Sequence, residues 1–310
     1  MKGRSLIRLP SQADFDLKKI AESGQCFRLM PAQPPRETEL FSLLHSKGTS
    51  IESYRLPVKD RVLFLGQDGE GRVYMDCSDE DFEEIWAPYF DLDRDYRAVR
   101  EGVDAKKDSF LAQALESGKG IRILRQDPWE CLVTFVISQR KNIPAIQKAV
   151  ETLAQEGGDL LAFDGEERPI YRFPGPREVH AFSEDSFKRI RLGYREKYIR
   201  RLAADLAQTP GILETYRDLS DPDLMDRLLS FYGVGIKIAS CVALFAYGRL
   251  DLAPIDVWME RVSRDYYGGE MDLTAYSPHA GLIQQYLFYH IRLIQGGLPR
   301  PEARQDGRSD

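Results

Sequence analysis

The amino-acid sequence predicts an α+β protein in which an N-terminal antiparallel sheet domain precedes an all-helical domain. Three short runs near the N-terminus are apolar or alternating and are separated by Gly, Asp and Ser, as is typical of strands: residues 41–57, 60–68 and 71–77. Farther along the chain, apolar residues recur with helical spacing. We therefore expect a sheet domain over residues 1–110, a helical domain over residues 111–300 and a polar, disordered tail over residues 301–310.

The connecting segments support this order of elements. Residues 67–72 combine Asp and Gly and predict the turn of a β-hairpin. The acidic stretch 79–95 predicts a helix whose charged face lies in solvent. Asp127 and Pro128 suit the N-cap and the first position of a strongly apolar helix. The helices expected in this part of the chain span residues 128–138, 144–155, 221–232, 236–247, 256–267 and 281–294.

Composition argues against several classes of protein. The chain has 310 residues and 43% hydrophobic content, which is enough for a large buried core. It contains no apolar run of about 20 residues, so we expect no membrane-spanning helix and no membrane partner. Residues 1–15 lack the apolar centre of a secretory leader. The four cysteines form no CxxC pair, so we expect thiols rather than a zinc or iron–sulfur site.

Charge is unevenly distributed along the chain. The net charge of −6 argues mildly against a nucleic-acid partner. Residues 187–201, however, are strongly basic. Because local fields steer ligands, an acidic protein can still present a basic surface to DNA.

The segment from Leu228 to Val262 is the most informative part of the sequence. It predicts two helices joined by a tight turn, Gly233-Val234-Gly235, within a helix–hairpin–helix over residues 222–247. We expect the two glycines to permit positive φ and to leave the backbone uncovered. Amides of Gly233 and Gly235 could then approach a DNA phosphate closely at the start of the next helix. Alone, such a turn is more often an ordinary connection between two helices.

Lys237 and Asp256 give this segment its chemistry. Lys237 falls in the first helical turn, where the helix dipole disfavours a cation, and an amine is nucleophilic only when neutral. Asp256 can cap the following helix while facing Lys237, and its charge would stabilise a cationic sugar. The plainer alternatives are a phosphate-binding surface lysine and a simple N-cap, and capping is compatible with catalysis.

Together these features resemble the 8-oxoguanine DNA glycosylase/AP lyase family within the helix–hairpin–helix glycosylase superfamily. The resemblance extends over nearly the whole chain. Besides the hairpin, it rests on four motifs that are weak singly and strong in their joint order: FDLKKIAESGQCFRL at 15–29, GIRILRQDPWECLVTFVISQRKNI at 120–143, LGYREKY at 192–198 and AGLIQQYLF at 280–288.

The resemblance implies a role for each matching residue. Lys237 would form a Schiff base and Asp256 would be the catalytic carboxylate. Cys241 and Phe288 would sandwich a flipped base, while Gln284 would read its edge. The carbonyl of Gly24 would accept the N7 hydrogen of 8-oxoguanine. Further positions match residues that contact DNA: Tyr194, Arg195, Lys141 and Asn142. A monovalent cation site is matched by the backbone carbonyls of Leu229, Phe231 and Val234. For the pocket residues, ordinary core packing is the plain alternative.

Three positions depart from the family pattern. Arg140 stands where the family has an asparagine that fills the space left by the flipped base. Ala145 replaces an arginine that reads the opposite cytosine, and Trp258 replaces a histidine near a phosphate. These departures make the preference for cytosine opposite the lesion uncertain, while the nucleophile and pocket are retained.

The sequence therefore favours a bifunctional DNA glycosylase/AP lyase acting on 8-oxoguanine in double-stranded DNA. Three alternatives stay open: a monofunctional 3-methyladenine-type glycosylase, an iron–sulfur glycosylase branch, and a non-catalytic DNA-binding module. Lys237 argues against the first, the lack of cysteines after Cys241 against the second, and the pairing of Lys237 with Asp256 against the third. We expect a monomer that needs no cofactor, located with the bacterial nucleoid in the cytoplasm or in a eukaryotic nucleus.

Overall fold

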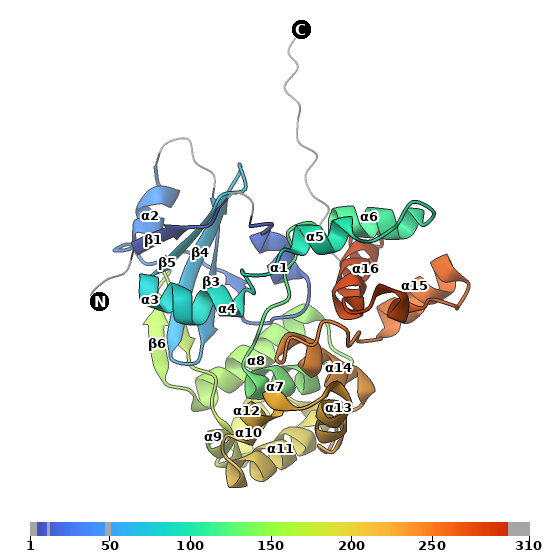
Figure 1. The fold of residues 1–310 in the computed structure, drawn as a ribbon. Helices are drawn as coiled ribbons and strands as arrows, with labels where there is room; N and C mark the ends of the chain where they lie inside the picture. Colours follow the sequence, from blue (N-terminus) through green and yellow to red (C-terminus); the bar gives the residue numbers. More distant parts are fainter. Residues whose placement is uncertain (1–4, 11–12, 47–50, 297–310) are drawn as a thin grey trace.

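The computed structural model describes residues 5–10, 13–46 and 51–296. Its N-terminal part contains one antiparallel sheet of five strands in the order β1-β5-β4-β3-β2. The strands are β1 (Ser5–Arg8), β2 (Met30–Pro31), β3 (Ile51–Val58), β4 (Arg61–Asp68) and β5 (Val73–Cys77). The predicted α+β class is thus confirmed, with the sheet first and helices after it (Figure 1). The expected tail over residues 301–310 lies outside the described residues.

The hairpin predicted at residues 67–72 is confirmed. Strands β4 and β5 pair from Gln67 opposite Val73 onward. The Asp68 carboxylate accepts hydrogen bonds from the backbone N–H groups of Glu70 and Arg72, at 3.0 and 2.9 Å. Gly71 takes a φ of +81°, which glycine adopts without strain.

The strand expected within residues 41–57 begins later in the structure than the sequence predicted. Residues 41–44 belong to helix α2 (Glu39–Leu44), and the strand starts only at Ile51. The reason is local capping, because the Thr38 side chain accepts a hydrogen bond from the N–H of Phe41 and so starts a helix. The alternating residues from Ile51 onward do form the predicted strand.

The acidic stretch 79–95 is helical but not wholly solvated. It forms α3 (Asp79–Asp81), a π-helical turn (Phe82–Trp86) and α4 (Ala87–Tyr89). Asp91 is only 3% exposed, so the expectation of a solvent-facing charged run is wrong at this position. Its carboxylate accepts hydrogen bonds from Arg94, Tyr96 and Arg125, which compensate its burial.

The rest of the described chain is mainly helical. The helices are α1 (Leu17–Glu22), α5 (Tyr96–Glu101), α6 (Ser109–Ser117), α7 (Pro128–Ser138), α8 (Ile143–Gly157), α9 (Pro176–His180), α10 (Glu184–Ile190), α11 (Glu196–Gln208), α12 (Ile212–Thr215), α13 (Asp221–Leu229), α14 (Ile236–Phe245), α15 (Val257–Tyr267) and α16 (Ala280–Ile294). Short 3₁₀ turns cover Gly193–Arg195, Tyr216–Asp218 and Leu273–Tyr276. Among the described residues, no helix combines the length and apolarity that crossing a membrane requires.

A small hairpin of β6 (Leu160–Phe163) and β7 (Pro169–Tyr171) links the helical part to the sheet. Ile170 packs with Leu40, Val62 and Phe64 in a small core on the sheet, and Figure 1 shows β6 beside the strands. The two larger cores do not divide at residue 110, since Phe27 packs in the helical core and Leu124 in the sheet core. The boundary expected between the domains therefore stays a prediction.

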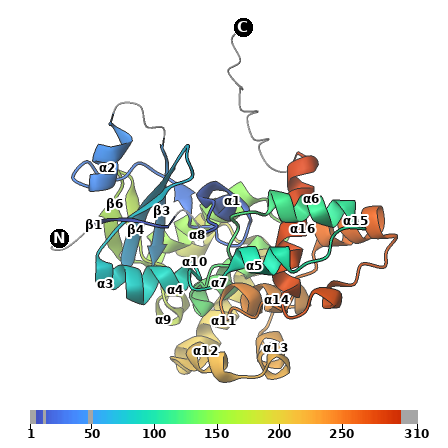
Figure 2. The ribbon, with the colours of Figure 1, turned by 45° about the horizontal axis from the view of Figure 1, so that its top comes forward.

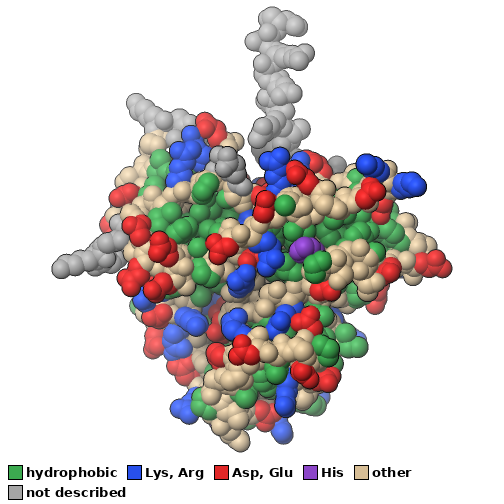
Figure 3. All heavy atoms as spheres, in the orientation of Figure 1, with side chains coloured by type: hydrophobic (Ala, Val, Ile, Leu, Met, Phe, Trp, Pro, Cys, Tyr) green, Lys and Arg blue, Asp and Glu red, His purple; other side chains and the backbone are tan. Residues whose placement is uncertain are grey.

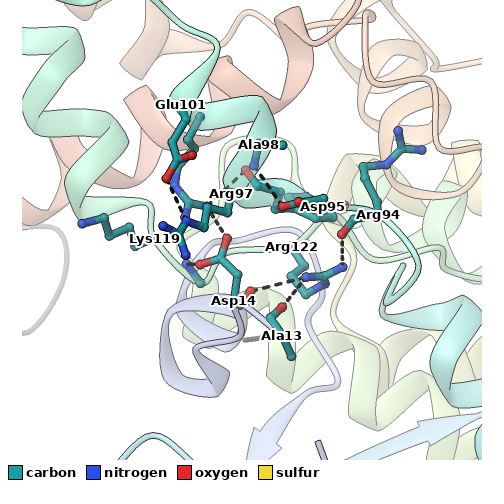
Figure 4. Close-up of polar contacts among 12 residues, drawn as sticks. Ala13, Asp14, Arg94, Asp95, Arg97, Ala98, Glu101, Lys119 and Arg122 are labelled. Carbon is teal, nitrogen blue, oxygen red and sulfur yellow. Dashed lines mark hydrogen bonds and ion pairs between the residues drawn. The ribbon is translucent and has the colours of Figure 1, made fainter. Parts of the chain in front are cut away.

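Arg122 joins three segments at the centre of the molecule. Its guanidinium is buried and lies 4.3 Å from the Tyr96 ring centroid. Within the part of the chain that the structure describes, it donates hydrogen bonds to backbone carbonyls alone, those of Ala13, Asp14, Phe90, Asp91 and Arg94. Figure 4 shows the guanidinium between the 13–14 and 94–98 segments. Five carbonyl acceptors replace the water that would otherwise solvate the buried charge.

A second buried arginine ties the sheet to the helices. Arg28 donates to Glu151 of α8 at 2.8 Å and lies 3.9 Å from Glu130 of α7. Arg55 of β3 donates to the other oxygen of Glu151 at 2.7 Å. Burial raises the pKa of Glu130 to about 7, against the opposing effect of Arg28. Glu130 is therefore protonated in the folded chain at pH values where the unfolded chain has released its proton.

This difference predicts a pH-dependent stability. Between Glu130's ordinary pKa and about 7, the folded state binds the extra proton, so its stability falls as pH rises. Glu130→Gln removes this penalty. We expect the free energy of unfolding of the variant, relative to that of the wild type, to rise by up to about 3 kcal/mol between pH 4.5 and 7.5. Denaturant titrations across this range measure the gap. Glu37→Gln, at an exposed carboxylate, is the control, and a gap that stays constant with pH would contradict the assignment.

Candidate functional site

The turn between α13 and α14 is built around Gly233. This residue has a φ of +89°, and a Cβ atom there would lie 2.4 Å from Cγ of Tyr198. Gly235 differs, because its φ is −98° and it caps α14 from extended backbone. The expectation that both glycines supply a positive φ is therefore wrong for Gly235. Nothing lies within 4 Å of a Cβ built there, so its backbone is uncovered as predicted.

Lys237 is the second residue of α14 and is half-buried. Its Nζ lies 5.1 Å from the centroid of the Phe135 ring in α7. One turn later, Cys241 is buried, and burial raises the pKa of its thiol. The neighbouring Lys237 amine opposes this rise through its charge and a side-chain hydrogen bond. The amine thus has an aromatic face and a polarisable sulfur beside it.

Asp256 caps helix α15, as the sequence predicted for its structural role. Its Oδ1 accepts hydrogen bonds from the N–H groups of Trp258 and Met259, at 3.0 and 3.1 Å. Both capping bonds use the same oxygen. The side chain is half-buried and lines the same cavity as Lys237. Its position therefore suits both capping and charge stabilisation.

The candidate nucleophile, carboxylate and pocket residues converge on one cavity of about 30 Å³. Its lining includes Lys237, Asp256, Gly24, Cys241, Gln284 and Phe288. It adjoins a larger cleft of about 730 Å³, with which it shares Gly24, Lys237, Asp256 and Phe288. A cavity this small holds a water molecule or two. A purine can enter only if the walls move.

The wall opposite Lys237 comes from α16 and the loop after α1. Gly24 has a φ of +77°, and a Cβ there would lie 3.4 Å from Cε1 of Phe288. Gln284 is 3% exposed, and its Oε1 has no hydrogen-bond partner among the described residues. A buried acceptor without a donor is costly unless a ligand supplies one. The orphaned oxygen therefore points to a ligand with a donor group.

Sequence reasoning missed the residues that hold this loop in place. The Gln25 amide donates to Ser23 Oγ at 2.9 Å and to the Arg122 carbonyl at 2.8 Å, and it accepts from the N–H of Leu124 at 2.8 Å. Gln285 of α16 donates to the Ser23 carbonyl at 2.7 Å. Gln25 belongs to the SGQ motif. The motif identified this loop in the sequence, but it did not indicate that the Gln25 amide anchors the loop.

Arg292 is a second residue that the sequence did not reveal. It is 7% exposed, and its Nη1 donates to the Glu22 carbonyl at 2.9 Å. Its guanidinium lies 5.2 Å from the centroid of the Phe288 ring, one turn earlier in α16. Arg292 therefore joins the end of α1 to the aromatic wall of the pocket.

The loop between α7 and α8 borders the larger cleft. Arg140 is exposed, has a φ of +52° and lines the cleft. Arg195 is buried and donates to the carbonyl of Gln139, the residue before Arg140. Asn142 caps α8 through the N–H of Ala145. Arg195 therefore supports the Arg140 loop, while Asn142 has a structural role beside the predicted DNA contact.

Of the other predicted contacts, Trp258 lies at the same cleft, while Tyr194 and the carbonyls of the turn are not among its lining residues. Tyr194 is 46% exposed and lies under the Arg195 guanidinium at 4.4 Å. Trp258 lines the cleft and stacks with Arg261, at 4.9 Å from its ring centroid. The carbonyls proposed for a monovalent cation, those of Leu229, Phe231 and Val234, lie at the end of α13 and in the turn, where the Phe231 carbonyl accepts from the N–H of Val234 at 3.1 Å. Nothing else in the structure tests this cation site, so it stays a prediction.

The basic run 187–201 is largely neutralised by its neighbours. Arg189 pairs with Glu156, Lys188 with Asp185, Arg201 with Asp205, and Arg200 with both Glu184 and Glu196. On the face drawn in Figure 3, acidic and basic side chains are likewise interspersed. Any electrostatic attraction for DNA must therefore come from a few cations rather than from the whole run.

Comparison with known proteins gives consistent matches over nearly the whole chain. The family described as "8-oxoguanine DNA glycosylase, N-terminal domain" matches residues 8–132. The N-glycosylase/DNA lyase of Saccharomyces cerevisiae is 31% identical over 83% of this chain and 69% of its own. A structure of MBOgg1 in complex with a low-affinity DNA ligand is 34% identical, with a TM-score of 0.80 over 95% of this chain and 98% of that one.

A second solved structure agrees. The Clostridium acetobutylicum 8-oxoguanine glycosylase/lyase, in complex with double-stranded DNA containing cytosine opposite 8-oxoguanine, is 28% identical, with a TM-score of 0.79 over 96% of this chain and 97% of that one. A shared fold, identities above 30% over most of the chain and the converging site residues agree with the resemblance. The chain belongs to the 8-oxoguanine DNA glycosylase family of N-glycosylase/DNA lyases.

Proposed function

We propose that Lys237 is the nucleophile with which this DNA N-glycosylase/AP lyase removes 8-oxoguanine from duplex DNA and then cleaves the strand. One observation carries the assignment. Lys237 and Asp256 line a single cavity with four further residues that suit a purine: Gly24, Cys241, Gln284 and Phe288. The lysine nucleophile also separates this function from that of a monofunctional glycosylase or a non-catalytic DNA-binding module.

The damaged base has to leave the helix before it can react. A base inside a duplex is out of reach of an amine that lies within the pocket, so the nucleotide is flipped into the pocket. Phe288 and Cys241 would take the two faces of the base, which favours a flat aromatic ligand. Because the cavity is small, flipping is coupled to an outward movement of Phe288 or the Gly24 loop.

The chemistry then needs an amine and a nearby negative charge. The neutral Lys237 nitrogen attacks C1′ of the sugar as the bond from C1′ to N9 breaks, and the electron pair leaves with the base. Asp256 stabilises the cationic sugar that develops in this step. The attacking nitrogen, now positively charged, gives up one proton to the departing base and one to the ring oxygen O4′ as the C1′–O4′ bond breaks, which leaves a Schiff base between Nζ and C1′. Loss of a proton from C2′ expels the 3′ phosphate and cuts the strand.

Recognition of the oxidised base would come from two acceptors. Gly24 lines the pocket, and its carbonyl would accept the N7 hydrogen that 8-oxoguanine carries and guanine lacks. The Gln284 Oε1, which has no partner among the described residues, can accept from the base's Watson–Crick edge. A base that lacks the N7 hydrogen would leave the Gly24 carbonyl without a donor, and an unpaired buried acceptor is costly. Gly24 would therefore act mainly by weakening the binding of unoxidised guanine.

The protein is expected to act as a monomer on double-stranded DNA. Its place of action follows from this substrate, namely the nucleoid of a bacterium or the nucleus of a eukaryote. The opposite strand would meet Arg140 at the mouth of the cleft, with Tyr194 as the wedge beside it.

Borohydride trapping on an 8-oxoguanine duplex tests the nucleophile. Lys237→Gln removes the amine assigned to the Schiff base, so trapping and strand cleavage should fall to background while duplex binding persists. Lys141→Gln is the matched control, because it removes another cleft lysine and should still form the adduct despite weaker binding. Robust trapping by Lys237→Gln would overturn the assignment.

The role of Asp256 can be separated from its cap. Asn still caps a helix but carries no charge, so Asp256→Asn should retain its melting temperature and lose roughly 10²-fold or more in base excision. Single-turnover excision provides the rate. Asp272→Asn, which alters the cap of the 273–276 turn, serves as control and should excise normally. Full activity of Asp256→Asn would leave Asp256 as a cap alone.

Arg140 predicts a relaxed choice of the base opposite the lesion. Its donors can reach acceptors on cytosine, thymine or guanine, and Ala145 supplies none. We expect cytosine to be preferred by no more than about 10-fold in single-turnover excision, or about 1.4 kcal/mol. Four duplexes that differ only in the opposite base measure this. Ala145→Arg should sharpen the preference for cytosine, and a strict cytosine requirement in the wild type would contradict the prediction.

A further inference from the structure

A second groove, of about 530 Å³, lies between helices α8 and α10, and we call it the α8–α10 groove. Among the described residues, its lining contains no carboxylate and five cationic side chains: Lys141, Lys148, Lys188, Arg189 and Arg191. Lys141 also lines the large cleft, so the groove continues from the candidate site. The groove is therefore a positively charged extension of the cleft.

Three of these five cations are available to pair with an anionic ligand. Lys188 and Arg189 already pair with Asp185 and Glu156. Lys141, Lys148 and Arg191 have no carboxylate partner among residues 5–10, 13–46 and 51–296. The Lys141 amine donates to the Arg191 carbonyl at 3.4 Å, which holds it at the junction with the cleft. Burial and the nearby Arg195 lower the pKa of Lys141, so an anion here would stabilise its charged form.

The groove begins beside the place where the opposite strand is expected and continues along α8. Arg140 and the supporting Arg195 lie at the start of α8, and Ala145 lies in its first turn. Lys148 follows Ala145 by three residues, so the two are neighbours on one face of the helix. Ala145 and Ala149 are small and keep the groove open. A chain of phosphates can therefore run from Arg140 past Lys141 towards Lys148.

We propose that the α8–α10 groove binds the sugar–phosphate backbone of the undamaged strand, beyond the base left unpaired by flipping. The inference rests on the proposed function, since it places the opposite strand at Arg140. A groove lined by cations and small side chains grips a regular anion without reading its bases. Contacts to the backbone thereby take the place of the base contact that Ala145, with its short apolar side chain, cannot make.

Salt dependence of binding tests the proposal. Removal of one phosphate contact lowers the slope of log K against log salt by about 0.9. Lys148→Ala should therefore reduce this slope by about 1 and weaken duplex binding several-fold, for damaged and undamaged duplexes alike. Lys107→Ala is the matched control, because it removes the same charge from an exposed lysine that does not line the groove. Equal slopes for the two variants would overturn the proposal.

A second measurement identifies the strand. Single phosphates are replaced by uncharged methylphosphonates, on either side of the base opposite 8-oxoguanine or at matching places in the damaged strand. Wild-type affinity should fall at one or two positions of the undamaged strand, and Lys148→Ala should show no further decrease there. The proposal would be overturned if the effects of Lys148→Ala and of the methylphosphonates were non-additive in the damaged strand instead, or in neither strand. Single-turnover excision by the Lys107→Ala control should equal that of the wild type, and trapping by Lys237→Gln tests the nucleophile separately, so failure of the groove is distinguishable from failure of the Lys237 mechanism.

Discussion

The candidate site depends on how residues 23–25 are held between the two parts of the molecule. Gln25 is fully buried, and its amide bonds the 122–124 segment while its carbonyl accepts from Gln126 at 2.7 Å. Gln285 fastens the same loop to α16. These bonds hold Gly24 at a positive φ against Phe288. Without them, the loop from the sheet side would have no fixed position relative to the helices, and one wall of the pocket would be missing. Figure 2 shows α1, which leads into this loop, between the sheet and α16.

The reactive groups come from separate elements that each have their own reason to be rigid. Lys237 and Cys241 lie on α14, whose starting position is set by the close packing of Gly233 against Tyr198. Asp256 is fixed because it caps α15. Phe288 is braced by Arg292, which also bonds the end of α1. The geometry of the site therefore results from helix termini and helix packing, and in the proposed mechanism the same side chains that stabilise these ends would supply the chemistry.

Much of this could be predicted from the sequence, because it is encoded locally. Helix α7 begins at Pro128 and ends at Ser138 as expected, since Asp127 caps it and its apolar face is continuous. Features set by distant contacts were missed. The burial of Asp91 depends on Arg125, and the role of Gln25 depends on Arg122 and Leu124. Neither interaction leaves a periodic pattern in the sequence. The pocket residues could be named only through the resemblance, because singly each is a plausible core residue.

The small volume of the pocket bears on how the proposed mechanism would treat ordinary DNA. A cavity of about 30 Å³ is smaller than a purine, so a base would be bound only by the fraction of molecules in which the walls have moved apart. The free energy of that opening would be the same for every base, whereas only an oxidised guanine would offer a hydrogen bond to the Gly24 carbonyl. A normal guanine would then meet the opening cost without the compensating bond and return to the helix. The narrow cavity would thus set a threshold on residence time and let undamaged sequence pass.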